Sequence, residues 1–312
     1  MNFSKIVNRK RNKWKCNNRR KRFLVTLVVP AFIVIIIFNI IPGITYLPAV
    51  FLNWTPPQSL WDAKWVGLDW FKKILNYYNL PELIRNSVIL GLWDIALLPI
   101  PLILAISCQY CGSPGMKKMI DILSLIPVFI PTVIVVAVTQ KILSYEGLLN
   151  QAMGLFGIAA ENHLLNGHLF YAYFSISALW SGMGFSCLVY RACLTVSNSE
   201  LHEAAKMDGA GLFKRIWYID LPLCRPAFLV NLIFQIGGIL NTNTERALLF
   251  KNTANSAYST TLDLYAYELT FKSSLMPAYS KAMALSVMLM IVNFLLLMLA
   301  RKAARKVEDI YA

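Results

Sequence analysis

Six apolar segments, each long enough to cross a lipid bilayer as a helix, constrain the fold of this chain more than any other feature. They cover residues 23–46, 84–108, 120–143, 169–190, 223–241 and 279–300. About 20 apolar residues span the hydrocarbon layer, where a backbone without water must satisfy its own polar groups. Only 15% of the residues are charged and the mean hydropathy is +0.54, whereas soluble domains average about 25% charged residues. The sequence therefore predicts an all-α membrane protein with six transmembrane helices.

A basic tail, residues 1–22, precedes the first segment and holds ten of the 30 lysine and arginine residues but no acid. Such a cluster beside a membrane span suits anionic lipid headgroups. No nucleic-acid-binding pattern accompanies it, so we expect membrane lipid and no nucleic acid as its partner. A signal peptide is the alternative interpretation, but the apolar core is long for one and no small-residue cleavage site follows. We therefore expect an uncleaved first span and a single transmembrane domain over residues 23–312.

The distribution of basic residues predicts the orientation. The tail and residues 109–121, 191–225 and 301–312 together hold 21 of the 30 basic residues. Basic residues near transmembrane ends concentrate on the cytoplasmic side. Six spans place these four segments on the same side of the membrane. We therefore predict that both termini and the loop between the fourth and fifth spans are cytoplasmic.

That loop, residues 195–222, has the pattern of a helix, a sharp turn and a second helix. Residues 200–207 are strong helix formers, and Gly209 lies where a helix would end in the left-handed conformation that glycine adopts most easily. The second helix has an apolar face, formed by Leu212, Phe213, Ile216 and Trp217. Pro222 suits the first turn of the following span, where no amide hydrogen is needed. An amphipathic connector at the membrane interface would show the same pattern.

The loop also contains a defined spacing: Glu-Ala-Ala, three residues, glycine, nine residues and Ile-x-Leu-Pro. The matching residues are Glu203, Ala204, Ala205, Gly209, Ile219, Leu221 and Pro222, with Asp208 and Ala210 completing an Asp-Gly-Ala sequence. This pattern resembles the signature loop of permease subunits of binding-protein-dependent ABC importers. Ile126-Pro127 and the segment 238–241 are similar to the carbohydrate branch of that family, above all to polysaccharide and oligosaccharide permeases of Gram-positive bacteria. The likeness covers most of the chain from about residue 22.

The resemblance implies a type I ABC importer transmembrane-domain fold in a bacterial cell membrane. It also implies the partners: a second homologous permease, two cytoplasmic ATPase subunits, an extracellular lipoprotein that binds the substrate, and a carbohydrate substrate. Residues 203–210 would dock on an ATPase, and residues 212–222 would return the force to the membrane. Only the partner subunits would bind ATP, because the chain has no phosphate-binding Gly-x-x-x-x-Gly-Lys-Ser/Thr sequence. We therefore expect no catalytic residues and no cofactor in this chain.

The six cysteines do not predict a metal site. Cys108 and Cys111 have the spacing of a ligand pair, but no second pair or histidine cluster has a matching spacing. The predicted orientation places all six cysteines on or near the cytoplasmic side, so we expect reduced, structural thiols and no metal.

Polar residues within the spans are candidates for the substrate path, because such residues usually face a cavity or another helix. The candidates are Asp94, Trp180, Asn231, Gln235 and Asn241. Amide and carboxylate groups would hydrogen-bond a sugar, and the tryptophan would offer it an aromatic face. Small residues at helical spacing, such as Ser177, Ser181 and Gly184, more often form packing surfaces. Asp94 would alternatively pair with a basic residue of the second permease.

Three other functions fit parts of this pattern. An importer of the same class with a non-sugar cargo would use the same loop. An ion-gradient-driven secondary transporter would show inverted repeats and several intramembrane carboxylates, whereas only Asp94 lies well within a span and no repeat is visible. A membrane scaffold or sensor would be expected to carry a cytoplasmic domain, and none follows the spans.

Overall fold

The computed structural model describes residues 22–23, 25–26, 28–195, 199–272 and 277–311. The predicted basic tail, apart from Arg22, lies outside the described residues. The chain divides into two compact units, Met1–Trp70 and Phe71–Ala312. The described residues include six helices long and apolar enough to cross a membrane, which confirms the predicted fold class. They cover Val28–Phe51, Leu80–Tyr110, Thr132–Gly154, Gly167–Thr195, Leu212–Gly237 and Tyr279–Arg305.

The first unit consists of one long apolar helix followed by a small tryptophan-rich cap. The helix continues from residues 28–35 through the π turn η1 (Ile36–Ile40) and α2 (Ile41–Tyr46) to the 3-10 helix η2 (Leu47–Phe51). Its side chains from Val28 to Pro48 are exposed, as expected for a lipid-facing helix. The cap contains η3 (Leu60–Asp62) and pairs β1 (Leu52–Asn53) with β2 (Lys64–Trp65) in antiparallel register, Leu52 opposite Trp65.

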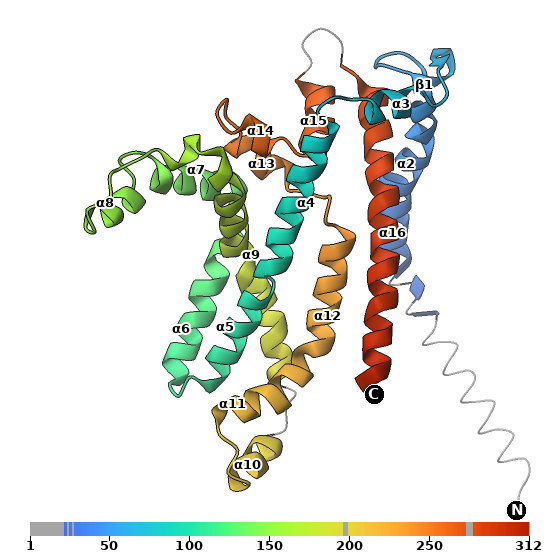
Figure 1. Cartoon of the computed structure of the whole chain (residues 1–312). Helices are drawn as coiled ribbons and strands as arrows, with labels where there is room; N and C mark the ends of the chain where they lie inside the picture. Colours follow the sequence, from blue (N-terminus) through green and yellow to red (C-terminus); the bar gives the residue numbers. More distant parts are fainter. Residues whose placement is uncertain (1–21, 24, 27, 196–198, 273–276, 312) are drawn as a thin grey trace, which may run out of the picture. The chain divides into compact units, whose positions relative to one another are not determined.

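The second unit is helical, and α3 (Asp69–Leu75) leads into it. Its elements are α4 (Leu80–Leu97), α5 (Pro99–Tyr110), α6 (Pro114–Leu125), η4 (Ile126–Phe129), α7 (Thr132–Leu143), α8 (Leu148–Gly154), η5 (His163–Leu165), η6 (Gly167–Leu169), α9 (Phe170–Thr195), α10 (Ser199–Met207), α11 (Leu212–Arg215), η7 (Ile216–Asp220), α12 (Leu221–Gly237), α13 (Thr244–Phe250), α14 (Ser256–Ser259), α15 (Leu262–Phe271) and α16 (Tyr279–Tyr311). Figure 1 shows α10 and α11 at one end of this unit and α13 to α15 at the opposite end.

The third predicted span, residues 120–143, is not one helix. It is divided into the end of α6, the short η4 and α7. Ile130 has extended backbone angles (φ −83°, ψ 125°) immediately before Pro131, because the proline ring disfavours a helical conformation of the preceding residue. Pro127 removes a further amide donor. Both prolines lie within the segment predicted as one span, and together they end one helix and begin another.

The fifth predicted span begins earlier in the structure than residue 223. The chain is helical without a break from Leu212 to Gly237. Pro222 is in the first turn of α12, as predicted, but further helical turns precede it. The proline ring would clash with the carbonyl four residues before it in a regular α-helix. The π turn η7 ends two positions before this proline, and Leu221 N–H donates to the Ile216 carbonyl five residues back. The first unit repeats the arrangement, since η1 ends two positions before Pro42.

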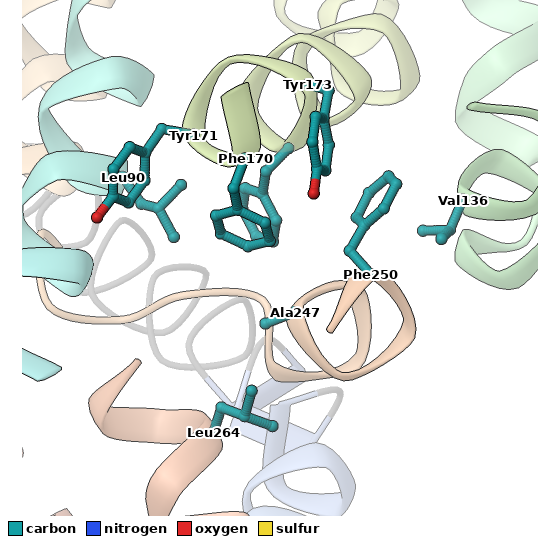
Figure 2. Close-up of a cluster of buried hydrophobic side chains, with 9 residues drawn as sticks. Leu90, Val136, Phe170, Tyr171, Tyr173, Ala247, Phe250 and Leu264 are labelled. Atoms are coloured by element: carbon teal, nitrogen blue, oxygen red, sulfur yellow. The ribbon is translucent and has the colours of Figure 1, made fainter. Parts of the chain in front are cut away.

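Two buried hydrophobic clusters hold the second unit together, and α9 contributes to both. Near the α13 end, its aromatic residues pack against α4, α7, α13 and α15. Figure 2 shows Phe170 and Tyr173 between Leu90 and Phe250, and the rings of Tyr173 and Phe250 lie 5.1 Å apart, within the range of favourable aromatic pairs. Towards the α10 end, Cys187, Tyr190 and Leu194 of α9 pack with side chains of α5 and α12.

One close approach of two backbones positions the divided third span. A β-carbon placed on Gly184 of α9 would overlap the backbone carbonyl of Ser124 on α6. The ion pair between Asp121 on α6 and Arg191 on α9 lies on the same interface. Glycine is therefore required here because there is no space for a side chain.

We predict that Gly184→Ala destabilises the protein, whereas Gly182→Ala on the same helix does not. A β-carbon on Gly182 would meet no atom within 4 Å, so this variant is a matched control. Overpacking costs about 1–3 kcal/mol, and the cost is at the upper end here because the opposing atom belongs to the backbone. Thermal unfolding of the purified protein in detergent measures the difference. Equal melting temperatures of the two variants would contradict the close approach.

Candidate coupling site and transport path

The loop between α9 and α12 has the predicted helix–turn–helix geometry. Gly209 has φ +76°, the left-handed conformation predicted for it. The Ala210 N–H donates to the Ala205 carbonyl at 2.8 Å and closes the end of α10. A β-carbon on Gly209 would meet no atom within 4 Å, so the backbone angle rather than limited space requires glycine. Residues 196–198 of the predicted loop lie outside the described residues.

The outer surface of α10 and the turn is open. Glu203, Ala204 and Asp208 are exposed, and Ala205 is half-buried. Met207 is 88% exposed and Phe213 of α11 is 84% exposed. Large apolar side chains at such exposure, beside carboxylates, are typical of a surface that another protein covers.

The other end of the signature pattern is buried. Asp220, which fills the undefined position between Ile219 and Leu221, has no solvent exposure. Its Oδ2 accepts a hydrogen bond of 2.5 Å from the hydroxyl of Tyr110, the last residue of α5. Its Oδ1 lies 3.3 Å from Nε2 of His202 on α10. The Arg215 guanidinium lies 5.4 Å from the centre of the Tyr110 ring. Sequence reasoning missed this cluster, although an acid between Ile219 and Leu221 is a detectable signal.

Two of the predicted path residues share one cavity. Asp94 of α4 and Gln235 of α12 line a cavity of about 220 Å³, together with serines of α9. Arg246 of α13 is 5% exposed and donates a hydrogen bond of 2.9 Å to the Ser181 hydroxyl. Burial lowers the pKa of Arg246, and the charges of Asp94 and Glu245 oppose this shift. The cavity therefore combines a carboxylate, an amide and hydroxyls with a cation nearby.

The other three predicted path residues do not line this cavity. Trp180 lines a separate apolar cavity of about 440 Å³ beside α7. Asn231 donates 3.1 Å to the hydroxyl of Tyr190, so it contributes to helix packing. Asn241 accepts 2.7 Å from the side chain of Asn293 on α16. Asn231 and Gln235 are four residues apart on α12 and therefore lie on one stripe of that helix. Asn231 nevertheless bonds Tyr190, whereas Gln235 lines the cavity.

A short hydrogen-bonded connection fixes the chain just after α12. The Thr242 N–H donates 2.7 Å to Oδ2 of Asp263 on α15, and the Thr242 hydroxyl donates 2.8 Å to the Thr261 hydroxyl. Burial raises the pKa of the Asp263 carboxyl, and the bond from Thr242 opposes that shift. This contact holds the α13 end of the fifth span.

Comparisons with known proteins agree with this fold. Residues 112–308 match the family described as binding-protein-dependent transport system inner membrane component. The polygalacturonan/rhamnogalacturonan transport system permease protein YteP of Bacillus subtilis is 30% identical over 298 residues, covering 94% of this chain and 91% of the relative. Protein LplB of Bacillus subtilis is 29% identical over 298 residues, covering 95% and 92%.

A solved structure has the same fold over nearly its whole length. It is a crystal structure of a bacterial ABC transporter involved in the import of the acidic polysaccharide alginate. The matched chain is 25% identical, with a TM-score of 0.81, covering 95% of this chain and 99% of that one. The fold is therefore that of a type I ABC importer transmembrane domain. The chain belongs to the binding-protein-dependent transport system inner membrane component family, and it is a multi-pass membrane permease.

We predict that Asp263→Asn stabilises the protein more at neutral pH than in acid. A carboxyl whose folded pKa is raised binds its proton more tightly in the folded state, so its contribution to stability falls as pH rises from the unfolded value of 3.8 through the folded one. Asparagine keeps an oxygen for Thr242 N–H without carrying this charge. Asp263→Ala is the control, because it leaves that N–H unsatisfied and costs about 1–3 kcal/mol. Melting temperatures at about pH 4 and about pH 8 measure the effect. A rise in melting temperature of Asp263→Asn that is larger in acid than at neutral pH would contradict a raised pKa of Asp263.

Proposed function

We propose that this chain forms half of the translocation path of an ATP-driven importer for oligosaccharides or polysaccharide fragments. The observation that carries the proposal is the exposed α10–Gly209–α11 element, which is joined without a helix break to α12. The names of similar proteins supply the cargo class: one is a polygalacturonan/rhamnogalacturonan transport system permease protein, and the matched structure is that of a transporter involved in the import of alginate.

The proposed partners follow from the family and from the loop surface. A second homologous permease would complete the path, and an extracellular lipoprotein would deliver the saccharide. Two cytoplasmic ATPase subunits would bind ATP and cover α10 and α11. Met207 of α10 and Phe213 of α11 are exposed there, and so are the carboxylates Glu203 and Asp208. A buried apolar anchor within a polar rim is the common anatomy of a protein interface.

The geometry suggests how force would pass through this chain. Closure of the ATPases on ATP would displace α10. The turn at Gly209 would carry the displacement to α11, and the continuous helix Leu212–Gly237 would carry it into the membrane. The cavity between Asp94 and Gln235 lies against this helix, so its shape would change as the helix tilts. Asp94 and Gln235 would provide hydrogen bonds to sugar hydroxyls there.

The proposed orientation places α10 in the cytoplasm, with both termini on the same side. Its support is the distribution of basic residues, 21 of 30 in the segments assigned to that side. A cysteine introduced at position 207 in a variant lacking the six natural cysteines should react with a membrane-impermeant maleimide only in inverted vesicles. Labelling in intact cells would contradict this orientation.

We predict that Gly209→Val abolishes saccharide uptake and saccharide-stimulated ATPase activity while leaving membrane insertion and assembly intact. A β-branched residue at φ +76° is strained, so the turn between α10 and α11 must change. Gly211→Val is the matched control, because Gly211 has ordinary extended angles and open space around it. Uptake into cells and ATPase activity of the reconstituted importer are the measurements. Uptake at the parent level in Gly209→Val would remove the loop from the coupling role.

We predict that the cargo is a saccharide. The reconstituted importer with its binding protein should show stimulated ATPase activity with one or more members of a panel of oligogalacturonides, alginate oligosaccharides and neutral oligosaccharides. Amino acids, phosphate and polyamines serve as negative controls. Stimulation by one of these controls alone would favour the same importer class with a non-sugar cargo.

A further inference from the structure

The side chain of Asp220 is a carboxylate that is completely buried. It has no solvent exposure and lies at the last position of the π turn η7. A buried charge needs complementary partners, because the free-energy cost of burying it without them is far larger than that of leaving it at the surface. A π turn offsets the helix faces before and after it and frequently occurs at functional sites. The turn that accommodates Pro222 therefore also fixes where Asp220 points.

The two carboxylate oxygens contact two different elements. Oδ2 accepts the 2.5 Å hydrogen bond from Tyr110 at the end of α5. Oδ1 lies 3.3 Å from His202 Nε2 on α10. That contact falls short of hydrogen-bond geometry, and among the described residues both atoms are buried without another hydrogen-bond partner. A small displacement of α10 is enough to complete or break the contact.

The aromatic ring of Tyr110 is also held from both sides of the cluster. The Arg215 guanidinium of α11 lies 5.4 Å from its centre, and the His202 ring meets it edge-on at 6.3 Å. Tyr110 thus contacts α10, α11 and η7 from the end of α5. Four elements meet at one buried carboxylate and one ring.

We infer that Asp220, with Tyr110 and His202, is a positioning cluster that joins α10 to α5 and α12, so that a displacement of α10 moves both membrane helices together. This inference rests on the proposed coupling function of the loop and adds the residues that transmit the displacement. Without the cluster, a displacement of α10 would move α5 and α12 less, and ATP hydrolysis would proceed with less transport.

The test is transport per ATP hydrolysed in the complete importer reconstituted in liposomes, with oligogalacturonide-loaded binding protein as the probe. Tyr110→Phe removes only the hydroxyl that donates to Asp220, and Asp220→Asn removes the charge. Each should lower transport per ATP by about tenfold, because the free energy of one hydrogen bond to a charged group corresponds to a factor of at least that size. Combining both changes should lower it little further, because the two residues act through one contact.

A matched control separates this role from mere structural damage. Tyr173→Phe removes another buried tyrosine hydroxyl, which accepts 2.9 Å from Asn255 near the α13 end. It should leave transport per ATP unchanged even where the melting temperature falls. His202→Gln provides a second, mild change on the α10 side, and it should lower the ratio in assembled complexes.

The outcomes distinguish the inference from the proposed function. Parent-level transport per ATP in assembled Tyr110→Phe and His202→Gln complexes overturns the positioning cluster. If Gly209→Val nevertheless abolishes stimulated ATPase activity, the loop still couples and only the cluster is wrong. If Gly209→Val has no effect either, the proposed coupling function itself fails.

Discussion

The need to pair every buried backbone polar group is the constraint on which this structure depends, because each break in a helix leaves donors and acceptors without partners. Side-chain amides meet this need around α13 to α15. Asn86 of α4 donates to the carbonyls of Ala257 and Thr260, Gln140 of α7 donates to that of Leu249, and Asn255 donates to that of Phe250. Irregular backbone there is thus bound to the regular helices, which makes the region part of the helical body.

Helix α9 connects the two ends of the second unit. Its first turns contribute aromatic side chains to the cluster beside α13, and its last turns pack against α5 and α12. Between them, Gly184 allows α6 to approach closely. One helix therefore contacts the cavity lined by Asp94, the divided third span and the buried end of the signature loop, and it fixes their relative positions.

The fold was largely predictable because hydropathy and length depend on the chain alone, and Gly209 was predictable because its conformation is local. The break before Pro131 required weighing two prolines together. The site was predictable only in part. Helical spacing puts Asn231 and Gln235 on one stripe of α12, but Asn231 donates a hydrogen bond to Tyr190, which is 41 positions away in the sequence. Asp220 escaped notice because the family pattern leaves its position undefined, and its partners come from segments distant in sequence.

The unbroken helix from Leu212 to Gly237 is a rod of 26 residues, roughly 39 Å long at 1.5 Å per residue. Asp220 divides it unequally: the part before it measures about 12 Å, and the 17 residues of α12 after it measure about 26 Å. Under the proposed coupling, a helix held near Asp220 would have a short arm at the loop and a long arm in the membrane. If it tilted as one piece about that point, Gly237 would move about twofold further than Leu212, in proportion to these lengths. Such a division would favour a wide opening of the path.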